Sequence, residues 1–241
     1  MKHFHFAEIT STNDYAKDLL ASNDVVFVTC DYQTGGRGRN QKVWLGDYGN
    51  NLYFSVGIKH QTPPDIELIS AYQGLGCLAV MRCLQAKLPI IEFALKYPND
   101  VMAKMDGAYK KICGVLIEHS FLGSACESTI IGAGVNVNQT KFPELPGINP
   151  VSMKQLGGEF DLTSLTKDMI ATFRALLKLD LEQIHLLWEK ELNISGREIT
   201  LVSDQSKWIA DGILTDGRLM LHSPDGAKQK IIDNGDSIRY L

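Results

Sequence analysis

The sequence has 241 residues, 44% of them hydrophobic, and a formal net charge of −4 at neutral pH. A chain of this length can bury one large core, or one core with a small appended module. The mildly acidic balance excludes a general electrostatic attraction to nucleic acid or to an anionic membrane. The N-terminus has no long apolar segment of the secretory type, and no apolar stretch approaches the length of a membrane span.

The cysteines indicate a reducing compartment. Their number is odd, no pair has CxxC spacing, and four lie within apolar runs. This pattern is typical of reduced thiols in a core, and not of a disulfide framework or a zinc site. We therefore expect a soluble, cytoplasmic protein. The cysteines are Cys30, Cys77, Cys83, Cys113 and Cys126.

The first ninety residues predict two helices, two strands and a long loop. Residues 11–14 form a good N-cap, so a short helix should follow them. The β-branched run 25–30 predicts a buried strand, and residues 31–50, with five glycines, predict a loop. Alternating apolar residues at 52–58 predict a strand with one buried face. Residues 63–65 are expected to open a helix of about twenty residues.

The middle of the chain predicts four more strands, followed by helices. The strand-like runs are 93–96, 101–105, 111–120 and 128–138. Residues 139–158 contain three prolines and three glycines and predict a loop. The apolar spacing over 162–177 predicts a second long helix, and residues 184–188 suggest a further helical segment.

The chain changes character near Asn193, where short strand patterns begin to alternate with turn pairs. Such pairs supply the positive φ that tight turns need. The sequence therefore predicts a mixed domain at 1–193 with a largely antiparallel sheet, and a small all-β module at 194–241. The turn pairs are Asp211-Gly212, Asp216-Gly217, Asp225-Gly226 and Asn234-Gly235.

A loop rich in glycine and arginine is the first candidate binding segment. It spans residues 33–39, with the sequence QTGGRGR, and Trp44 follows it. Glycines let backbone N–H groups approach a ligand closely, and arginine forks suit carboxylate or phosphate. The alternative is a solvated surface loop. The segment is not a P-loop, because GxxxxGK[ST] is absent.

Three further segments combine glycine or charge with strand ends. Asn99 and Asp100 follow Pro98, which predicts a turn that can present oxygens to a hydrated Mg²⁺ or to a nucleotide. Lys111 leads into the apolar run 112–117, which predicts a strand buried on both faces, although most lysines are simply solvated. The glycines in IGAGVNVN (131–138) indicate close backbone approach, but the missing third glycine excludes a dinucleotide fingerprint.

The order of these segments resembles the biotin protein ligase family from about residue 4 to residue 241. The shared elements are Ser-Thr-Asn, GRGR with a following Trp, K-aromatic-P-N-D, K-x-x-G with three hydrophobic residues and Glu, and IGAG-x-N. The resemblance implies an α+β, class II aminoacyl-tRNA synthetase-like catalytic domain with a C-terminal SH3-like β-barrel. It also implies ATP-dependent formation of biotinyl-5′-AMP and transfer of biotin to a lysine of a biotin carboxyl carrier protein, with Mg²⁺ as cofactor.

The same resemblance assigns the site residues. Lys111 and Arg37 are the expected catalytic cations, and Asn99 and Asp100 the expected metal site, directly or through water. The expected biotin contacts are Ser11, Thr12, Asn13, Gln33, Gly36, Arg37, Arg39, Lys111, Gly114 and Gly132. The expected nucleotide contacts are Arg37, Arg39, Trp44, Asn99, Asp100, Lys111 and Asn136.

Two departures and two alternatives accompany the resemblance. Tyr97 stands where the family usually has tryptophan. Few residues precede Ser11, so we expect neither the helix-turn-helix domain of repressor-type members nor a DNA partner; we also expect no membrane partner.

A lipoate–protein ligase is one alternative, although an RRxxGGG-like element is lacking, and a non-catalytic biotin-binding protein is the other. A monomer and a homodimer are both compatible with the sequence.

Overall fold

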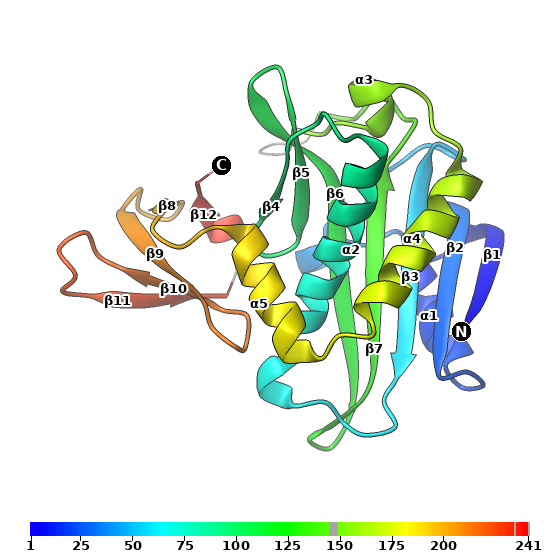
Figure 1. The fold of residues 1–241 in the computed structure, drawn as a ribbon, viewed down its shortest axis with the longest axis horizontal. Helices are drawn as coiled ribbons and strands as arrows, with labels where there is room; N and C mark the ends of the chain where they lie inside the picture. The colour runs from blue at the N-terminus through cyan, green and yellow to red at the C-terminus, as the bar shows by residue number, and fades with distance from the viewer. Residues whose placement is uncertain (145–148, 234, 241) are drawn as a thin grey trace.

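Seven described strands form the main sheet of the computed structural model, which describes residues 1–144, 149–233 and 235–240. The order is β1-β2-β3-β7-β6-β5-β4 (Figure 1). β1 runs parallel to β2, and the other neighbours pair antiparallel. This confirms the α+β class and the largely antiparallel sheet. The strands are β1 (Lys2–Ile9), β2 (Val25–Gln33), β3 (Asn51–Lys59), β4 (Phe93–Lys96), β5 (Asp100–Met105), β6 (Ala108–Leu122) and β7 (Ala125–Asn136).

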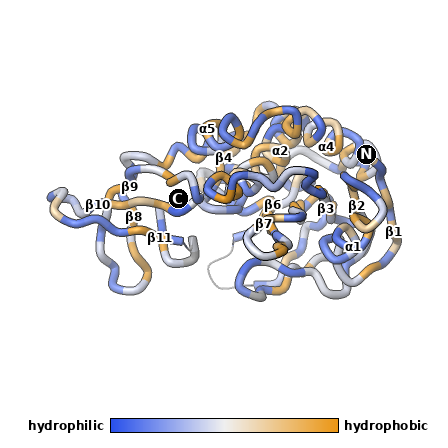
Figure 2. Tube along the Cα trace, turned by 90° about the horizontal axis from the view of Figure 1, so that it is seen from below, coloured by the Kyte–Doolittle hydropathy of each residue, from blue (hydrophilic) through white to orange (hydrophobic). Residues whose placement is uncertain are grey.

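Helices cover the two faces of this sheet unequally. α2, α4 and α5 lie together on one face, and α1 lies on the opposite face beside β2 and β3 (Figure 2). On this second face α1 also contacts β7. The helices are α1 (Thr12–Leu19), α2 (Ala71–Lys87), α3 (Met153–Gly157), α4 (Leu162–Leu176) and α5 (Leu181–Leu192), with 3₁₀ turns η1 (Arg39–Gln41), η2 (Ile66–Leu68) and η3 (Gly235–Ser237).

The strand expected to have one buried face is buried on both. In β3, Phe54 and Val56 join the main core, whereas Tyr53 belongs to a smaller cluster with Ala16 of α1. The alternation in the sequence is real, but α1 covers the face that carries Tyr53 and Ser55. The prediction failed because periodicity shows that two faces differ, and not that one of them meets water.

Several element boundaries also differ from the sequence prediction. The expected loop begins later, because β2 continues to Gln33. The long helix starts at Ala71, since Asp65 caps the separate turn η2. The expected loop at 139–158 contains α3, which a capping box from Ser152 starts; residues 145–148 of that loop lie outside the described residues. Ser11 is the N-cap of α1, yet its side chain makes no capping hydrogen bond within the described structure.

The C-terminal β module is confirmed as a five-stranded antiparallel sheet in the described residues, with the order β11-β10-β9-β8-β12. The Asp211-Gly212 pair is not a turn: it lies inside β9, where the register with β10 shifts and forms a bulge. Gly217 and Gly226 do adopt positive φ, +83° and +72°, in turns. Asn234 lies outside the described residues. The strands are β8 (Glu198–Leu201), β9 (Lys207–Ile213), β10 (Leu219–His222), β11 (Gln229–Ile232) and β12 (Ile238–Arg239).

One apolar core joins the two parts of the chain. Ile199 and Leu219 of the C-terminal module belong to the same buried cluster as Leu75 of α2. The boundary between residues 193 and 194 remains a prediction, because this core is continuous across it. All five cysteines of the described structure are free and buried, as expected. In the described parts of the chain, no helix is both long and apolar enough to cross a membrane.

Candidate active site

A cavity of about 280 Å³ opens beside α1, on the same face of the sheet, and Thr12 and Asn13 of that helix line it. Its floor is made by residues that pair across two strands: Gly114 of β6 faces Gly134 of β7, and Leu116 faces Gly132. The missing side chains of the glycines create the depth of the cavity. Gly114 and Leu116 are consequently only half-buried, and the run 112–117 is not buried on both faces as predicted.

A network of polar side chains closes one end of the cavity. The Gln33 side-chain oxygen accepts a hydrogen bond of 2.7 Å from the backbone N–H of Thr12. Asn13 donates from its amide nitrogen to Glu118 at 2.6 Å. Ser55 of β3 lies beneath both, with its hydroxyl 2.7 Å from the Thr12 hydroxyl and 2.6 Å from the Asn13 oxygen. Thr12 and Asn13 are buried although both line the cavity, so this end is rigid as well as polar.

The opposite end is built by the turn before β5 and by the start of β6. Asn99 donates from its side chain to the carbonyl of Val115 at 2.8 Å, and the Val115 N–H donates back to the Asn99 carbonyl at 2.9 Å. Asp100 forms an ion pair with Lys111 at 2.6 Å, with both side chains 20% exposed. The ammonium of Lys111 is therefore held within the cavity and not in bulk water.

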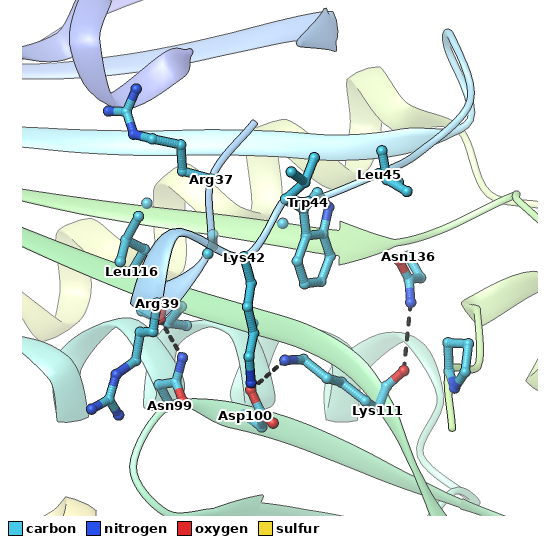
Figure 3. A pocket seen from close by; sticks show the side chains of 18 of the residues that line it. Arg37, Arg39, Lys42, Trp44, Leu45, Asn99, Asp100, Lys111, Leu116 and Asn136 are labelled. Atoms are coloured by element: carbon cyan, nitrogen blue, oxygen red, sulfur yellow. Dashed lines mark hydrogen bonds and ion pairs between the residues drawn. The ribbon is translucent and has the colours of Figure 1, made fainter. Parts of the chain in front are cut away.

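Arg37 does not point toward Lys111. Its two terminal nitrogens donate to the two oxygens of Asp14 at 2.8 and 2.6 Å, and one of them approaches Glu118 at 3.4 Å. These hydrogen bonds lower the pKa of Asp14 below its ordinary value of 3.8, and the same carboxylate raises the pKa of Arg37. Arg37 turns away from the cavity centre in Figure 3. The ion pair fixes the base of the glycine-rich loop to helix α1.

Trp44 lies across the floor of the cavity (Figure 3). A Cβ on Gly134 would come within 2.6 Å of the indole nitrogen, and one on Gly114 within 3.0 Å of the ring. The ammonium of Lys111 lies 5.5 Å from the ring centroid, a cation–π arrangement. The indole N–H is buried and has no acceptor among the described residues. A planar ligand over these strands has to stack on this indole or displace it.

Thirteen of the fourteen residues that the sequence assigned to the site line this cavity, the exception being Gly36. Gly36 lines an adjoining hollow, where a Cβ would meet the Trp44 carbonyl at 2.8 Å. Arg39 points away from Lys111 and donates to the Asp233 carbonyl at 3.3 Å. Gly132 makes room for Asn13, because a Cβ there would collide with the Asn13 amide.

Sequence reasoning missed lining residues from several regions, including Phe142, Pro143 and Pro150 of the loop expected at 139–158. Lys42 comes from the glycine-rich loop and extends toward Asp100 in Figure 3. Gly235 and Arg239 come from the C-terminal module. Lys42 lies between the segment 33–39 and Trp44, both of which the sequence had singled out, and could have been added to them. Nothing in the local sequence of Arg239 distinguishes it from a solvated arginine.

Tyr97 joins the C-terminal module to the cavity wall. Its hydroxyl lies 3.0 Å from the Gly217 carbonyl and 3.1 Å from the Ile232 carbonyl, and its backbone N–H donates to the Tyr240 hydroxyl at 2.6 Å. Burial raises the pKa of Tyr97 to about 12, so the phenol keeps its proton for these bonds. The replacement of the family's tryptophan thus retains a donor at this position.

Comparison with solved structures shows that biotin protein ligases share this fold. The biotin protein ligase from Aquifex aeolicus in complex with biotin and ATP aligns over 100% of this chain and 99% of its own, with a TM-score of 0.73 and 24% identity. A point mutant of the same Aquifex aeolicus ligase, in complex with biotin, gives a TM-score of 0.74 at 25% identity, covering 100% of this chain and 99% of its own. The class II synthetase-like fold with a C-terminal β domain is thereby established.

Sequence comparison identifies the family. Residues 5–136 match the biotin/lipoate A/B protein ligase family, and the chain belongs to this family. The bifunctional ligase/repressor BirA of Bacillus spizizenii is 29% identical over 95% of this chain and 72% of its own length. BirA of Salmonella typhimurium is 30% identical over 88% of this chain and 67% of its own length.

Proposed function

We propose that the chain is a biotin–protein ligase that converts biotin and ATP to biotinyl-5′-AMP and then transfers biotin to a lysine of a biotin carboxyl carrier protein. A relative from Mycobacterium tuberculosis is named biotin–[acetyl-CoA-carboxylase] ligase, and the structures with the same fold contain biotin with ATP, or biotin alone. The observation that carries the proposal is the position of Lys111. Its ammonium lies in the same cavity as the polar end and is held by Asp100 of the Asn99–Asp100 turn at 2.6 Å.

Lys111 explains how the first step overcomes charge repulsion. The biotin carboxylate attacks the α-phosphate of ATP, a new C–O–P linkage forms, and pyrophosphate leaves. Two anions must approach, so a fixed cation at their meeting point lowers the barrier. The ion pair with Asp100 supports this role, because it holds the Lys111 ammonium inside the cavity before a ligand binds.

The second step needs no nucleophile from the enzyme. The ε-amine of the carrier lysine attacks the carbonyl of the mixed anhydride, an amide forms, and AMP leaves while the amine gives up its proton. The buried thiols do not compete for this role. Burial raises the pKa of Cys77 to about 12 and that of Cys113 well above its ordinary value, so neither forms a thiolate near neutral pH.

The residues around the phosphate end fit a magnesium ion that keeps most of its water. Asp100 supplies one carboxylate, and Asn99 has its oxygen available because its nitrogen donates to Val115. The described residues contain no cluster of three acidic, histidine or cysteine ligands. Mg²⁺ is usually held by one or two carboxylates together with substrate phosphates. When bound, it would add positive charge to the phosphate oxygens.

The cellular setting follows from the same proposal. Buried, free cysteines are typical of a reducing cytoplasm, where carrier proteins for biotin are also modified. The carrier, rather than free lysine, is the proposed acceptor.

ATP–pyrophosphate exchange tests the proposal directly. The purified chain should catalyse exchange that depends on biotin and Mg²⁺, and lipoate should not replace biotin. Exchange with lipoate in place of biotin would identify a lipoate ligase. Tight biotin binding without any exchange would identify a non-catalytic binding protein. Transfer to a carrier domain, followed by mass spectrometry, checks the second step.

A further inference from the structure

Gln139 lies between two loops that line the cavity, and its side chain is buried. The first loop follows β2 and contributes Trp44 and Leu45 to the lining. The second loop follows β7 and contributes Phe142 and Pro143. Gln139 itself lines the adjoining hollow instead, so it acts on a ligand in the cavity through these loops.

The neighbours of Gln139 fix the orientation of its amide. Asn51, the first residue of β3, accepts from the Val137 N–H at 3.1 Å, so its nitrogen is the group that donates to Gln139. The oxygen of Gln139 therefore faces Asn51, and it also accepts from the Asp47 N–H of the first loop at 3.1 Å. The nitrogen of Gln139 donates to the Lys141 carbonyl of the second loop at 2.8 Å. One amide thus holds a backbone group of each loop.

The first loop is also packed closely against this network. A Cβ on Gly46 would collide with the Tyr53 hydroxyl and would come within 2.6 Å of the Asn51 amide nitrogen. Tyr53 and Asn51 are both buried. The segment around Gly46 and Asp47 is therefore held by the network that contains Gln139.

The two legs of the first loop are held separately. Arg37, which precedes Trp44, is bound to Asp14 of α1. Asp47, which follows Trp44, is bound to Gln139. Loss of the Gln139 amide therefore releases the second leg and leaves the first leg attached to α1.

We propose that Gln139 is a positioning residue that holds Trp44 and Phe142 at a fixed separation and thereby sets the affinity of the cavity for ATP. The two aromatic side chains come from different loops, so their separation depends on what joins the loops. Loops that are held before a ligand arrives cost less to order on binding. This inference rests on the proposed function and deepens it, because it names a residue outside the cavity that tunes nucleotide binding.

The test uses two variants and a matched control. Gln139→Met removes both hydrogen-bonding groups at a similar side-chain length, whereas Gln139→Glu keeps the acceptor and removes the donor. Gln183→Met is the control, because Gln183 accepts from the Asp180 N–H at the start of α5, on the other face of the main sheet. The exchange assay gives KM for ATP and KM for biotin. Trypsin, without ligand, reports on the first loop at Lys42 and on the second at Lys141.

Gln139→Met should raise KM for ATP about tenfold, the worth of one buried hydrogen bond, with KM for biotin within about twofold. It should also speed cleavage at both lysines. Gln139→Glu should speed cleavage at Lys141 more than at Lys42, because a carboxylate still accepts from Asp47 but repels the Lys141 carbonyl. Gln183→Met should change none of these quantities.

An unchanged KM for ATP in Gln139→Met overturns the proposal. So does an equal rise in both KM values, which a general structural defect would cause, or equal cleavage at the two lysines in Gln139→Glu. Thermal melting identifies a variant that does not fold, and Gln139→Glu then decides the matter if Gln139→Met is lost. If the unaltered chain shows no biotin-dependent exchange, the proposed function fails, while the cleavage pattern still decides whether Gln139 joins the loops.

Discussion

The ion pair between Lys111 and Asp100 is the central electrostatic feature at the scale of single residues. At 2.6 Å and 20% exposure of each side chain, the pair is partly shielded from water. Asp100 holds the ammonium in place, and the indole of Trp44 lies against its other side. A lysine held in this way is directed at a ligand without spending rotamer entropy when the ligand arrives.

Lys111→Ala should reduce kcat for adenylate formation by about 10²–10³, because it removes a preorganised donor from the transition state. Biotin binding should weaken as well, since a hydrogen bond to a charged group is lost. Stopped-flow or exchange kinetics measure the effect. Lys110→Ala is the control, because Lys110 is the neighbouring lysine and pairs with Asp106 outside the cavity. Near-normal exchange in Lys111→Ala would remove this residue from the mechanism.

At the scale of elements, the glycine-rich loop proves to be partly structured. Gly38 donates to the Lys42 carbonyl at 2.7 Å, and Trp44 donates to the Gly36 carbonyl at 3.0 Å. From the sequence, Arg37 and Arg39 would be expected to repel each other until an anion binds. The structure gives Arg37 two carboxylates instead. The base of the loop is therefore anchored to α1 without ligand, whereas Arg39 reaches across to the Asp233 carbonyl.

Asp14→Ala should make residues 35–44 more sensitive to protease in the absence of ligand. An exposed ion pair is worth roughly 0.2–1 kcal/mol, so cleavage should rise no more than about fivefold. Asp18→Ala, on an exposed position of the same helix, is the control. Equal cleavage in both variants would show that the pair does not hold the loop.

The same anchor has a defined pH dependence. Because the folded pKa of Asp14 is lowered, its contribution is present above the ordinary value of 3.8 and is lost as pH falls through the lower folded value. Protection of the loop should therefore stay constant from weakly acidic to weakly alkaline pH.

At the scale of the whole molecule, the C-terminal module completes the cavity. It contributes Gly235 and Arg239 to the lining, and Tyr97 connects it to the Asn99–Asp100 turn. The Asn99–Asp100 turn is thus held from two directions. Asn99 is hydrogen-bonded to Val115 of strand β6, and the neighbouring Tyr97 is hydrogen-bonded to the C-terminal module.

Tyr97→Phe should lower the free energy of unfolding by about 1–3 kcal/mol, because the buried carbonyl of Ile232 and the partly buried carbonyl of Gly217 lose the donor that they share. Urea denaturation measures the change. Tyr109→Phe is the control, since its hydroxyl donates to Glu92 at the surface. A loss no larger than that of the control would mean that water replaces the phenol and that Tyr97 does not brace the module.

The sequence by itself determined the features that depend on local chemistry. Gly132 and Gly134 predicted close backbone approach, and Pro98-Asn99-Asp100 predicted a turn with exposed oxygens. These signals are local because backbone freedom and turn formation depend on a few adjacent residues. The strands and the all-β module at the C-terminus were predictable for the same reason.

Only the tertiary structure decided which side chains meet. Arg37 binds Asp14 and Glu118, which are 23 and 81 residues away in the chain. Ser55 became part of the site because α1 covers one face of β3 and brings Thr12 above it. Alternation in a strand assigns a residue to a face, but the packing of distant elements decides what covers that face. That is why the floor of the cavity was predictable and the network beneath its polar end was not.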